Sequence, residues 1–160
     1  FTLPGSPNLY YGSEVDMTGG PDPEMRAPMR WDRVQAGHPT LAWTQRLIAL
    51  RRSHRALRVG DWRAITAQRL LAFERYTDRA ADTVLVIVNP SAEAVQETLL
   101  VANSKLMDST RFHDLLGSAS GEPPRLMASL LPVSLPPHGF LVLQPDVRPP
   151  GGYTNYKRVQ

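Results

Sequence analysis

Apolar side chains follow helical spacing in one stretch of the chain, between residues 39 and 57. They recur every three to four positions and would share one helix face: Trp43, Leu47, Leu50 and Leu57, with Ile48 beside them. Pro39 suits the first helical turn, and arginines 51, 52 and 55 suit the far end, where cations favour the helix dipole. The pattern predicts a helix over residues 39–57 that stops before Gly60 and Asp61.

Beyond residue 61 the pattern changes to short segments rich in Val, Leu, Ile, Thr and aromatic residues. Turn-like stretches at 76–82 and 89–92 separate the first of these segments, and prolines and a glycine mark the last turn, at 136–139. Short strands with turns between them are typical of an antiparallel sandwich. We expect strands near residues 62–67, 70–76, 83–89, 94–101, 112–116, 130–135 and 140–143.

The first 37 residues have little periodicity. Asn8 to Tyr11 is a candidate for a short strand, which would have to join a sheet to be stable. Residues 13–37 are rich in Gly, Pro, Asp and Arg and predict a long loop, of a length that is usually functional or disordered in compact domains.

These patterns predict an α+β chain with a boundary near residue 60. Residues 1–60 would form one strand–loop–helix segment. Residues 61–148 would form an all-β antiparallel sandwich, of a size that can fold alone. Residues 149–160, rich in Gly and Pro and then basic, would be a surface tail.

Composition narrows the function classes. Hydrophobic residues make up 42% and charged residues 21%, as in ordinary globular proteins, and no stretch has the apolar length needed to span a bilayer. The net charge is +3, but the arginines are spread among acidic residues without a basic run, which indicates a solvated surface rather than a nucleic-acid site. Because the chain has no cysteine, disulfides and thiolate metal sites are excluded.

Several motifs resemble glycoside hydrolase family 13, the α-amylase family. The segment Phe-Thr-Leu-Pro-Gly-Ser-Pro-Asn-Leu-Tyr-Tyr-Gly-Ser-Glu, residues 1–14, is similar to the family's eighth barrel strand. The stretch Met-Thr-Gly-Gly-Pro-Asp-Pro-Glu-Met-Arg-Ala-Pro-Met-Arg-Trp-Asp, residues 17–32, is similar to the loop that follows it in neopullulanases, cyclomaltodextrinases, maltogenic amylases and related α-glucosidases. Residues 47–54 look like the eighth barrel helix, and residues 71–75 and 135–139 look like the C-terminal β domain.

The resemblance implies the last βα unit of a TIM (β/α)8 barrel followed by the C-terminal domain. It begins after the family's nucleophile Asp, acid/base Glu and stabilising Asp, so we predict no catalytic residue in this chain. A retaining glycosidase needs two carboxyl groups about 5–5.5 Å apart, so the isolated chain should be inactive. The rest of the barrel would be its partner, an α-glucan or maltooligosaccharide the substrate of the intact enzyme, and no cofactor is expected.

Asp22 and Arg26 are the candidate substrate-binding residues. In the neopullulanase-like groups an Asp and an Arg at this spacing help to bind glucose units, and a carboxylate with a guanidinium can grip sugar hydroxyls through charged hydrogen bonds. The alternative is a loop salt bridge without a ligand. We expect Glu14 to fix the loop geometry by hydrogen bonding rather than to contact substrate.

Three aromatic residues and some polar ones allow further interpretations. Tyr10 and Tyr11 would pack at the strand end, with the alternative that one of them reaches the pocket, and Trp31 would either stack on a sugar ring or anchor the loop. The four histidines have no metal-ligand spacing, so no metal site is expected. Asp78 and Asp82 lack the spacing of a calcium loop and predict a solvated turn.

Two other readings remain open. The β domain could be a non-catalytic module that shields the barrel or binds starch weakly, with Trp62, Phe73 and Tyr76 as its sugar platform, although alternation along the strands suggests that some of these three point into the core instead. The chain could also be a truncated product. If the 160 residues were the whole polypeptide, the exposed apolar face of the first segment would require an oligomer or leave that segment disordered.

Overall fold

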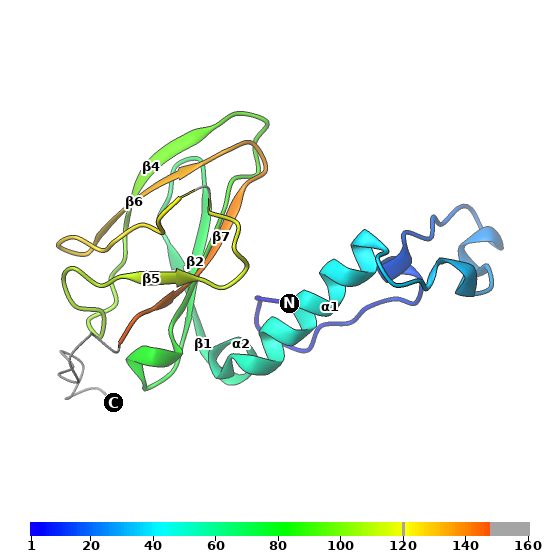
Figure 1. Cartoon of the computed structure of the whole chain (residues 1–160), viewed down its shortest axis with the longest axis horizontal. Coiled ribbons are helices and arrows are strands. Elements are labelled where there is room, and N and C mark those ends of the chain that lie inside the picture. The colour runs from blue at the N-terminus through cyan, green and yellow to red at the C-terminus, as the bar shows by residue number, and fades with distance from the viewer. Residues whose placement is uncertain (120, 148–160) are drawn as a thin grey trace. The chain divides into compact units, whose positions relative to one another are not determined.

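The computed structural model of the protein describes residues 1–119 and 121–147 (Figure 1). The chain divides into two compact units. Phe1 and Gly5–Ser53 form the first, which we call the loop-helix unit. Thr2–Pro4 and the chain from His54 onward form the second, the β unit. The tail predicted at residues 149–160 lies outside the described residues.

The loop-helix unit consists of three short turns of 3-10 helix and one α-helix. The turns are η1 (Ser13–Val15), η2 (Glu24–Arg26) and η3 (Trp31–Arg33), and the helix is α1 (Pro39–Ser53). The long loop predicted at residues 13–37 is therefore confirmed, with three local turns inside it. The strand predicted at residues 8–11 is wrong for the described part of the chain, where these residues form no ladder. A strand needs a neighbour to pair with, and the described residues supply none here.

The helix predicted over residues 39–57 is split in two. His54 takes an extended conformation, with φ −109° and ψ 111°, so α1 ends at Ser53 and a second short helix, α2 (Arg55–Val59), follows. Helical spacing of Leu50 and Leu57 continues across the break, which is why the apolar pattern did not reveal it.

Within the described residues, the β unit contains α2, seven strands and one 3-10 turn, η4 (Ala80–Asp82). The strands are β1 (Asp61–Ile65), β2 (Leu71–Tyr76), β3 (Val84–Val88), β4 (Val95–Leu100), β5 (Phe112–Asp114), β6 (Leu130–Leu135) and β7 (Phe140–Pro145). Each lies within one or two residues of a predicted segment at both ends. The prediction of antiparallel strands is confirmed.

The strands form two antiparallel sheets. The larger has the order β1-β2-β3-β7-β5, and the smaller pairs β4 with β6. In the smaller sheet Thr98 faces Pro132 across the ladder. Proline has no N–H to donate, and among the strands of residues 1–119 and 121–147 β6 pairs with β4 alone, so Pro132 breaks no bond to a further one of these strands.

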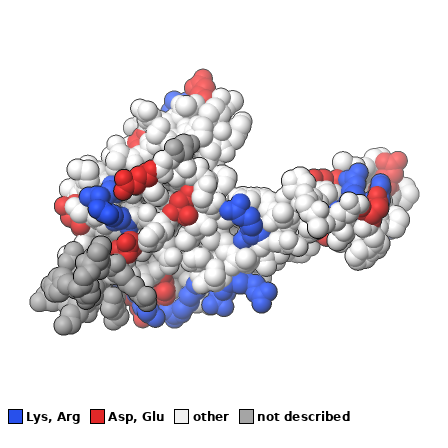
Figure 2. All heavy atoms as spheres, viewed as in Figure 1, with Lys and Arg blue, Asp and Glu red and all other residues white. Residues whose placement is uncertain are grey.

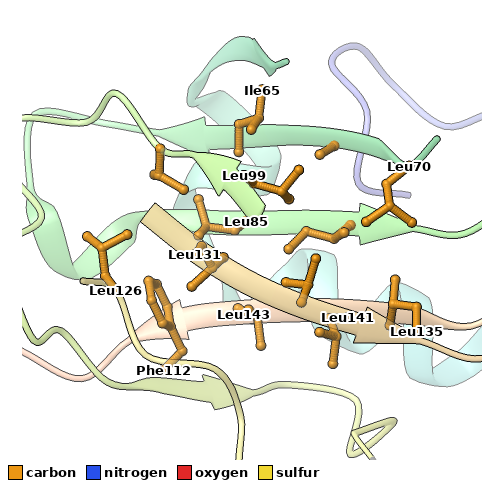
Figure 3. Packing of buried hydrophobic residues seen from close by; sticks show 14 of the residues in the cluster. Ile65, Leu70, Leu85, Leu99, Phe112, Leu126, Leu131, Leu135, Leu141 and Leu143 are labelled. Carbon is orange, nitrogen blue, oxygen red and sulfur yellow. The ribbon is translucent and has the colours of Figure 1, made fainter. Parts of the chain in front are cut away.

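One apolar cluster fills the space between the two sheets (Figure 3). Strands β1, β2, β3, β5 and β7 contribute side chains from the larger sheet, and β4 and β6 contribute from the smaller. Leu85, Ile87, Leu99, Leu131 and Leu143 are all fully buried. Figure 3 shows Leu85 and Leu143 of the larger sheet together with Leu99 and Leu131 of the smaller sheet in the space between the two layers, as in a sandwich core.

Charged and polar groups are also buried in this unit. Arg75 on β2 is almost fully buried, and its guanidinium donates to the carbonyls of Thr2 at 2.8 Å, Leu57 at 3.2 Å, Gly60 at 2.8 Å and Asp61 at 3.2 Å. A buried guanidinium must be hydrogen-bonded to be tolerated. One side chain thus joins three segments that are distant in the sequence.

These contacts bear on the predicted boundary near residue 60. The compact units divide between Ser53 and His54, and α2 belongs with the strands. Ala56 and Leu57 on α2 are fully buried, and Arg75 binds the carbonyls at its end. Burial and buried hydrogen bonds of α2, rather than the change in spacing, determine where the β unit begins.

Candidate functional site

The candidate site is the loop between Tyr11 and α1, and Gly12 begins it. Gly12 has φ +85°, and a Cβ there would lie 2.5 Å from Met17 Sδ, so only glycine fits. Its carbonyl accepts from the N–H groups of Val15 at 3.1 Å and Met17 at 2.9 Å. Val15 is fully buried beneath this turn. The local sequence thus folds the chain sharply as it enters the loop.

Asp22 and Arg26 lie together on the loop. Pro23 and η2 bring the two side chains to the same side, and Arg26 Nη2 donates to Asp22 Oδ1. Asp22 is 58% and Arg26 65% exposed, so the pair adds little to stability. Figure 2 shows acidic and basic atoms gathered where the loop lies. The structure brings the two predicted residues together, and their binding to a sugar stays a prediction.

The tyrosine pair lies differently from the expectation. Tyr10 and Tyr11 were predicted to pack at a strand end, yet both are exposed. Their rings are 4.7 Å apart, and Tyr11 Oη donates to the Ala27 carbonyl at 2.9 Å. Desolvation and the neighbouring Tyr10 raise the pKa of Tyr11. The prediction of packed tyrosines is wrong for the described residues, because no neighbouring strand covers the rings.

A hollow of about 240 Å³ lies between the tyrosine pair and the loop. Its other walls include Met17, Thr18 and Met25. Pockets that enclose small ligands usually measure roughly 300–1,000 Å³. The hollow is smaller than that range, so these walls alone do not enclose a sugar chain.

The side chains of Trp31 and Glu14 lie differently from what was considered for them: Trp31 is largely exposed, and one carboxylate oxygen of Glu14 is unpaired within the part of the chain that the structure describes. Trp31 is 74% exposed on η3, and the neighbouring Arg30 and Asp32 are joined at 2.8 and 2.6 Å. Hydrogen bonds from Arg30 lower the pKa of Asp32. Glu14 Oε2 is buried and has no hydrogen-bond partner among the described residues. The loop-fixing hydrogen bond expected of Glu14 is therefore not made by this oxygen.

The polar residues of the β unit agree with a structural role. Asp78 and Asp82 each lie 3.3 Å from Arg55 Nη1, and Thr77 donates to Asp82 at 2.8 Å. The Arg55 side chain lowers the pKa of Asp78. Among the described residues, no three His, Cys, Asp or Glu side chains gather as metal ligands. No helix in the same part of the chain has the length and apolar character of a membrane span.

The proposed sugar platform of the β unit is not formed by its three aromatic residues. Phe73 is only 3% exposed and lies in the interior, with its ring 6.1 Å from that of Trp62. Tyr76 is half-buried and covered by the Arg63 guanidinium at 5.1 Å. Trp62, at 46% exposed, is the one member with a largely accessible side chain.

Some residues of structural importance were missed by the sequence reasoning. Asp16, Arg33 and Thr40 connect the two ends of the loop, and Arg75 connects α2 and β1 to β2. Only Asp16 leaves a trace in the sequence, since Asp tolerates the left-handed conformation it adopts, with φ 56°. Nothing in the local sequence distinguishes Arg75 from the fifteen other arginines of the chain.

Comparison with known proteins gives a consistent result. A cyclomaltodextrinase of Geobacillus thermopakistaniensis is 37% identical over 142 residues, which is 88% of this chain and 23% of the relative. A solved structure of a cyclomaltodextrinase is 32% identical with a TM-score of 0.67, covering 91% of this chain and 24% of that one. The α-amylase of Geobacillus thermoleovorans, solved with acarbose, shares the fold with a TM-score of 0.73 at 24% identity.

No model of a known protein family matches the chain. The chain spans about a quarter of the length of these relatives, as the cyclomaltodextrinase match shows. Because 88% of the chain aligns with this relative, the match includes residues of both the loop-helix unit and the β unit. The chain is therefore related, over most of its own length, to a part of the α-amylase-family glycoside hydrolases, the group that includes cyclomaltodextrinases and maltogenic amylases.

Proposed function

We propose that the chain is the C-terminal part of a retaining glycoside hydrolase that acts on α-glucans or maltooligosaccharides. The loop-helix unit would complete a (β/α)8 barrel as its last βα segment, and the β unit would be the C-terminal domain. In such barrels the loops after the strands line the active site. The catalytic carboxylates would come from other barrel segments.

One observation carries this proposal. Asp22 and Arg26 lie paired and exposed on the loop that follows the Tyr-Tyr-Gly segment. The exposed apolar side chains of the same unit, among them Leu9, Ile48 and Trp31, support it, because a barrel would cover such surfaces. Asp22 and Arg26 would bind sugar hydroxyls, and each would contribute charged hydrogen bonds.

The test uses the complete enzyme and maltooligosaccharide hydrolysis. Asp22→Ala and Arg26→Ala should each lower kcat/KM by about 10- to 100-fold, the loss expected for one charged hydrogen bond. Asp32→Asn is the matched control, since Asp32 is an exposed carboxylate in a neighbouring ion pair, and it should change kcat/KM less than about twofold. Equal values for all three variants would remove Asp22 and Arg26 from the site.

A second measurement addresses activity of the chain alone. Because both carboxyl groups of a retaining pair would lie elsewhere, the 160-residue chain should release no reducing sugar from maltoheptaose. The opposite result would be that the purified chain hydrolyses maltoheptaose and that none of the variants above abolishes this activity. The reaction would then occur at residues that the proposal does not assign.

A further inference from the structure

Asp16, which lies directly after η1, joins the two ends of the loop, together with a longer hydrogen bond from Arg33 Nη1 to the carbonyl of its neighbour Val15 at 3.4 Å. Arg33 Nη1 donates to the Asp16 carbonyl at 2.7 Å. Thr40 Oγ1 donates to the Asp16 carboxylate, at Oδ2, at 2.7 Å. His38 Nε2 lies 4.0 Å from the same oxygen. Asp16 therefore contacts the last residue of η3 and the first turn of α1, through both its backbone and its side chain.

The far side of this contact is itself fixed. Arg33 is the last residue of η3, and its own N–H group donates to the Arg30 carbonyl at 3.0 Å. Thr40 lies in the first turn of α1, where His38 Nδ1 accepts from the Leu41 N–H at 3.4 Å. The His38 carbonyl also accepts from the Ala42 N–H at 2.9 Å. Asp16 is thus attached to the capped start of a 15-residue helix.

We propose that Asp16, Arg33 and Thr40 form a clasp that positions Asp22 and Arg26 for substrate binding. Residues 17–32 lie between the joined ends, so the clasp closes them into one loop. Within that loop, Ala27 receives a hydrogen bond from Tyr11, and Arg26 and Ala27 donate to the carbonyls of Pro23 and Glu24. Asp16 and Thr40 are positioning residues, because they act through the loop and do not touch the sugar.

The hydrogen bonds of the clasp should affect the conformation of the loop more than the free energy of unfolding of the chain. Asp16 is largely exposed, and a hydrogen bond at such a site is modest. Holding the ends of a loop together nevertheless removes much of its conformational freedom. Loss of the clasp should therefore raise the population of open loop conformations severalfold while the β unit stays folded.

This inference rests on the proposed function, and its first test does not depend on sugar binding. Trypsin can cleave the loop after Arg26 and Arg30, and cleavage after Arg79 in the β unit serves as the internal reference. Thr40→Val removes the hydroxyl while keeping the shape. It should raise the cleavage rate of the loop about fivefold relative to the reference, because proteolysis follows the population of the open form. Thr40→Ser, which keeps the hydroxyl, should restore the original rate.

Two controls separate the clasp from a general loss of structure. Thr98→Val removes an exposed hydroxyl from β4 and should leave the loop cleavage rate unchanged. Asp16→Gly keeps the positive φ and removes the carboxylate, so it should match Thr40→Val. The double variant should be no more sensitive than either single one, since both remove one interaction. Loop cleavage within twofold of the original in both single variants would overturn the clasp.

The second test is kinetic and uses the complete enzyme. Thr40→Val should raise KM for maltooligosaccharides about three- to tenfold and change kcat less, because the loop would bind before it contributes to chemistry. If KM rises in Thr40→Val and in Asp22→Ala, both proposals are supported. If loop cleavage rises but Asp22→Ala leaves kcat/KM unchanged, the clasp still closes the loop and the proposed sugar site fails. An unchanged KM in Thr40→Val beside a raised KM in Asp22→Ala overturns the positioning role.

Discussion

The two units differ in how they use their apolar side chains. In the β unit, side chains from all seven strands meet in one cluster between two sheets. In the loop-helix unit, Val15, Thr44 and Leu50 are buried, while Leu9, Tyr10, Trp31 and Ile48 are exposed. The difference indicates that the β unit can be stable through its own burial, whereas the loop-helix unit contains little burial of its own. It also explains why the candidate site lies in the unit with the smaller core.

The largest predicted effect tests this difference in burial directly. Leu131→Ala removes a fully buried side chain from the core shown in Figure 3 and should lower the free energy of unfolding by about 3 kcal/mol. Ile48→Ala, on the exposed side of α1, should cost less than about 0.5 kcal/mol. Urea unfolding followed by circular dichroism measures both. Equal costs would show that α1 is as well packed as the strands.

A slightly smaller effect is expected from the buried guanidinium. Arg75→Met should destabilise the chain by roughly 2–3 kcal/mol, because four carbonyls lose a charged donor. Arg58→Met on the exposed side of α2 is the control and should be nearly neutral. Hydrogen exchange of α2 amides should also become faster in Arg75→Met alone. If α2 keeps its protection, the four hydrogen bonds do not hold it.

Asn89 should give an intermediate effect. Its amide is fully buried and donates to the carbonyls of Glu93 at 2.7 Å and Pro136 at 2.8 Å, while Ser91 donates back to it. Asn89→Ala leaves those carbonyls without this donor and should cost about 2 kcal/mol. Asn8→Ala, at an exposed position of the loop-helix unit, should cost less than about 0.5 kcal/mol in the same denaturation assay. A neutral Asn89→Ala would mean that water replaces the amide.

The smallest effect depends on pH. Desolvation acts to raise the pKa of Glu97, but hydrogen bonds from the N–H groups of Gln68, Arg69 and Leu70 outweigh it and lower the pKa below its ordinary value of 4.5. A lowered folded-state pKa means that the unfolded state binds protons first, so this stabilisation is present above pH 4.5. It is lost as the pH falls through the folded-state pKa.

Glu97→Gln should therefore destabilise the chain by less than about 1 kcal/mol at neutral pH and have no effect once Glu97 is protonated. Glu93→Gln, at an exposed carboxylate paired with Arg69, is the matched control and should change the free energy of unfolding little. Unfolding curves between pH 2.5 and 7 compare the two. A pH-independent difference between Glu97→Gln and the original chain would contradict the assigned hydrogen bonds.

Much of the β unit could be predicted because strand patterns are local. Alternation in β6, where Leu131, Val133 and Leu135 are buried and their neighbours are exposed, follows directly from the two-residue repeat. The break at His54 could not be predicted, since the apolar spacing continues through it. For the candidate site, the motif identified Asp22 and Arg26, but the contacts of Asp16 with Arg33 and Thr40 join residues 17 and 24 positions apart and leave no local pattern.

The sequence by itself determined the strand segments, the long loop, the resemblance to α-amylase-family enzymes and the two candidate residues, because periodicity and motifs are properties of neighbouring positions. The tertiary structure decided which strands pair, that α2 belongs to the β unit, that Phe73 is buried and Tyr10 exposed, and that Asp16 joins the ends of the loop. The physical reason is that burial and long-range hydrogen bonds depend on which distant residues share a volume. That arrangement minimises the free energy of the whole chain rather than of any one segment.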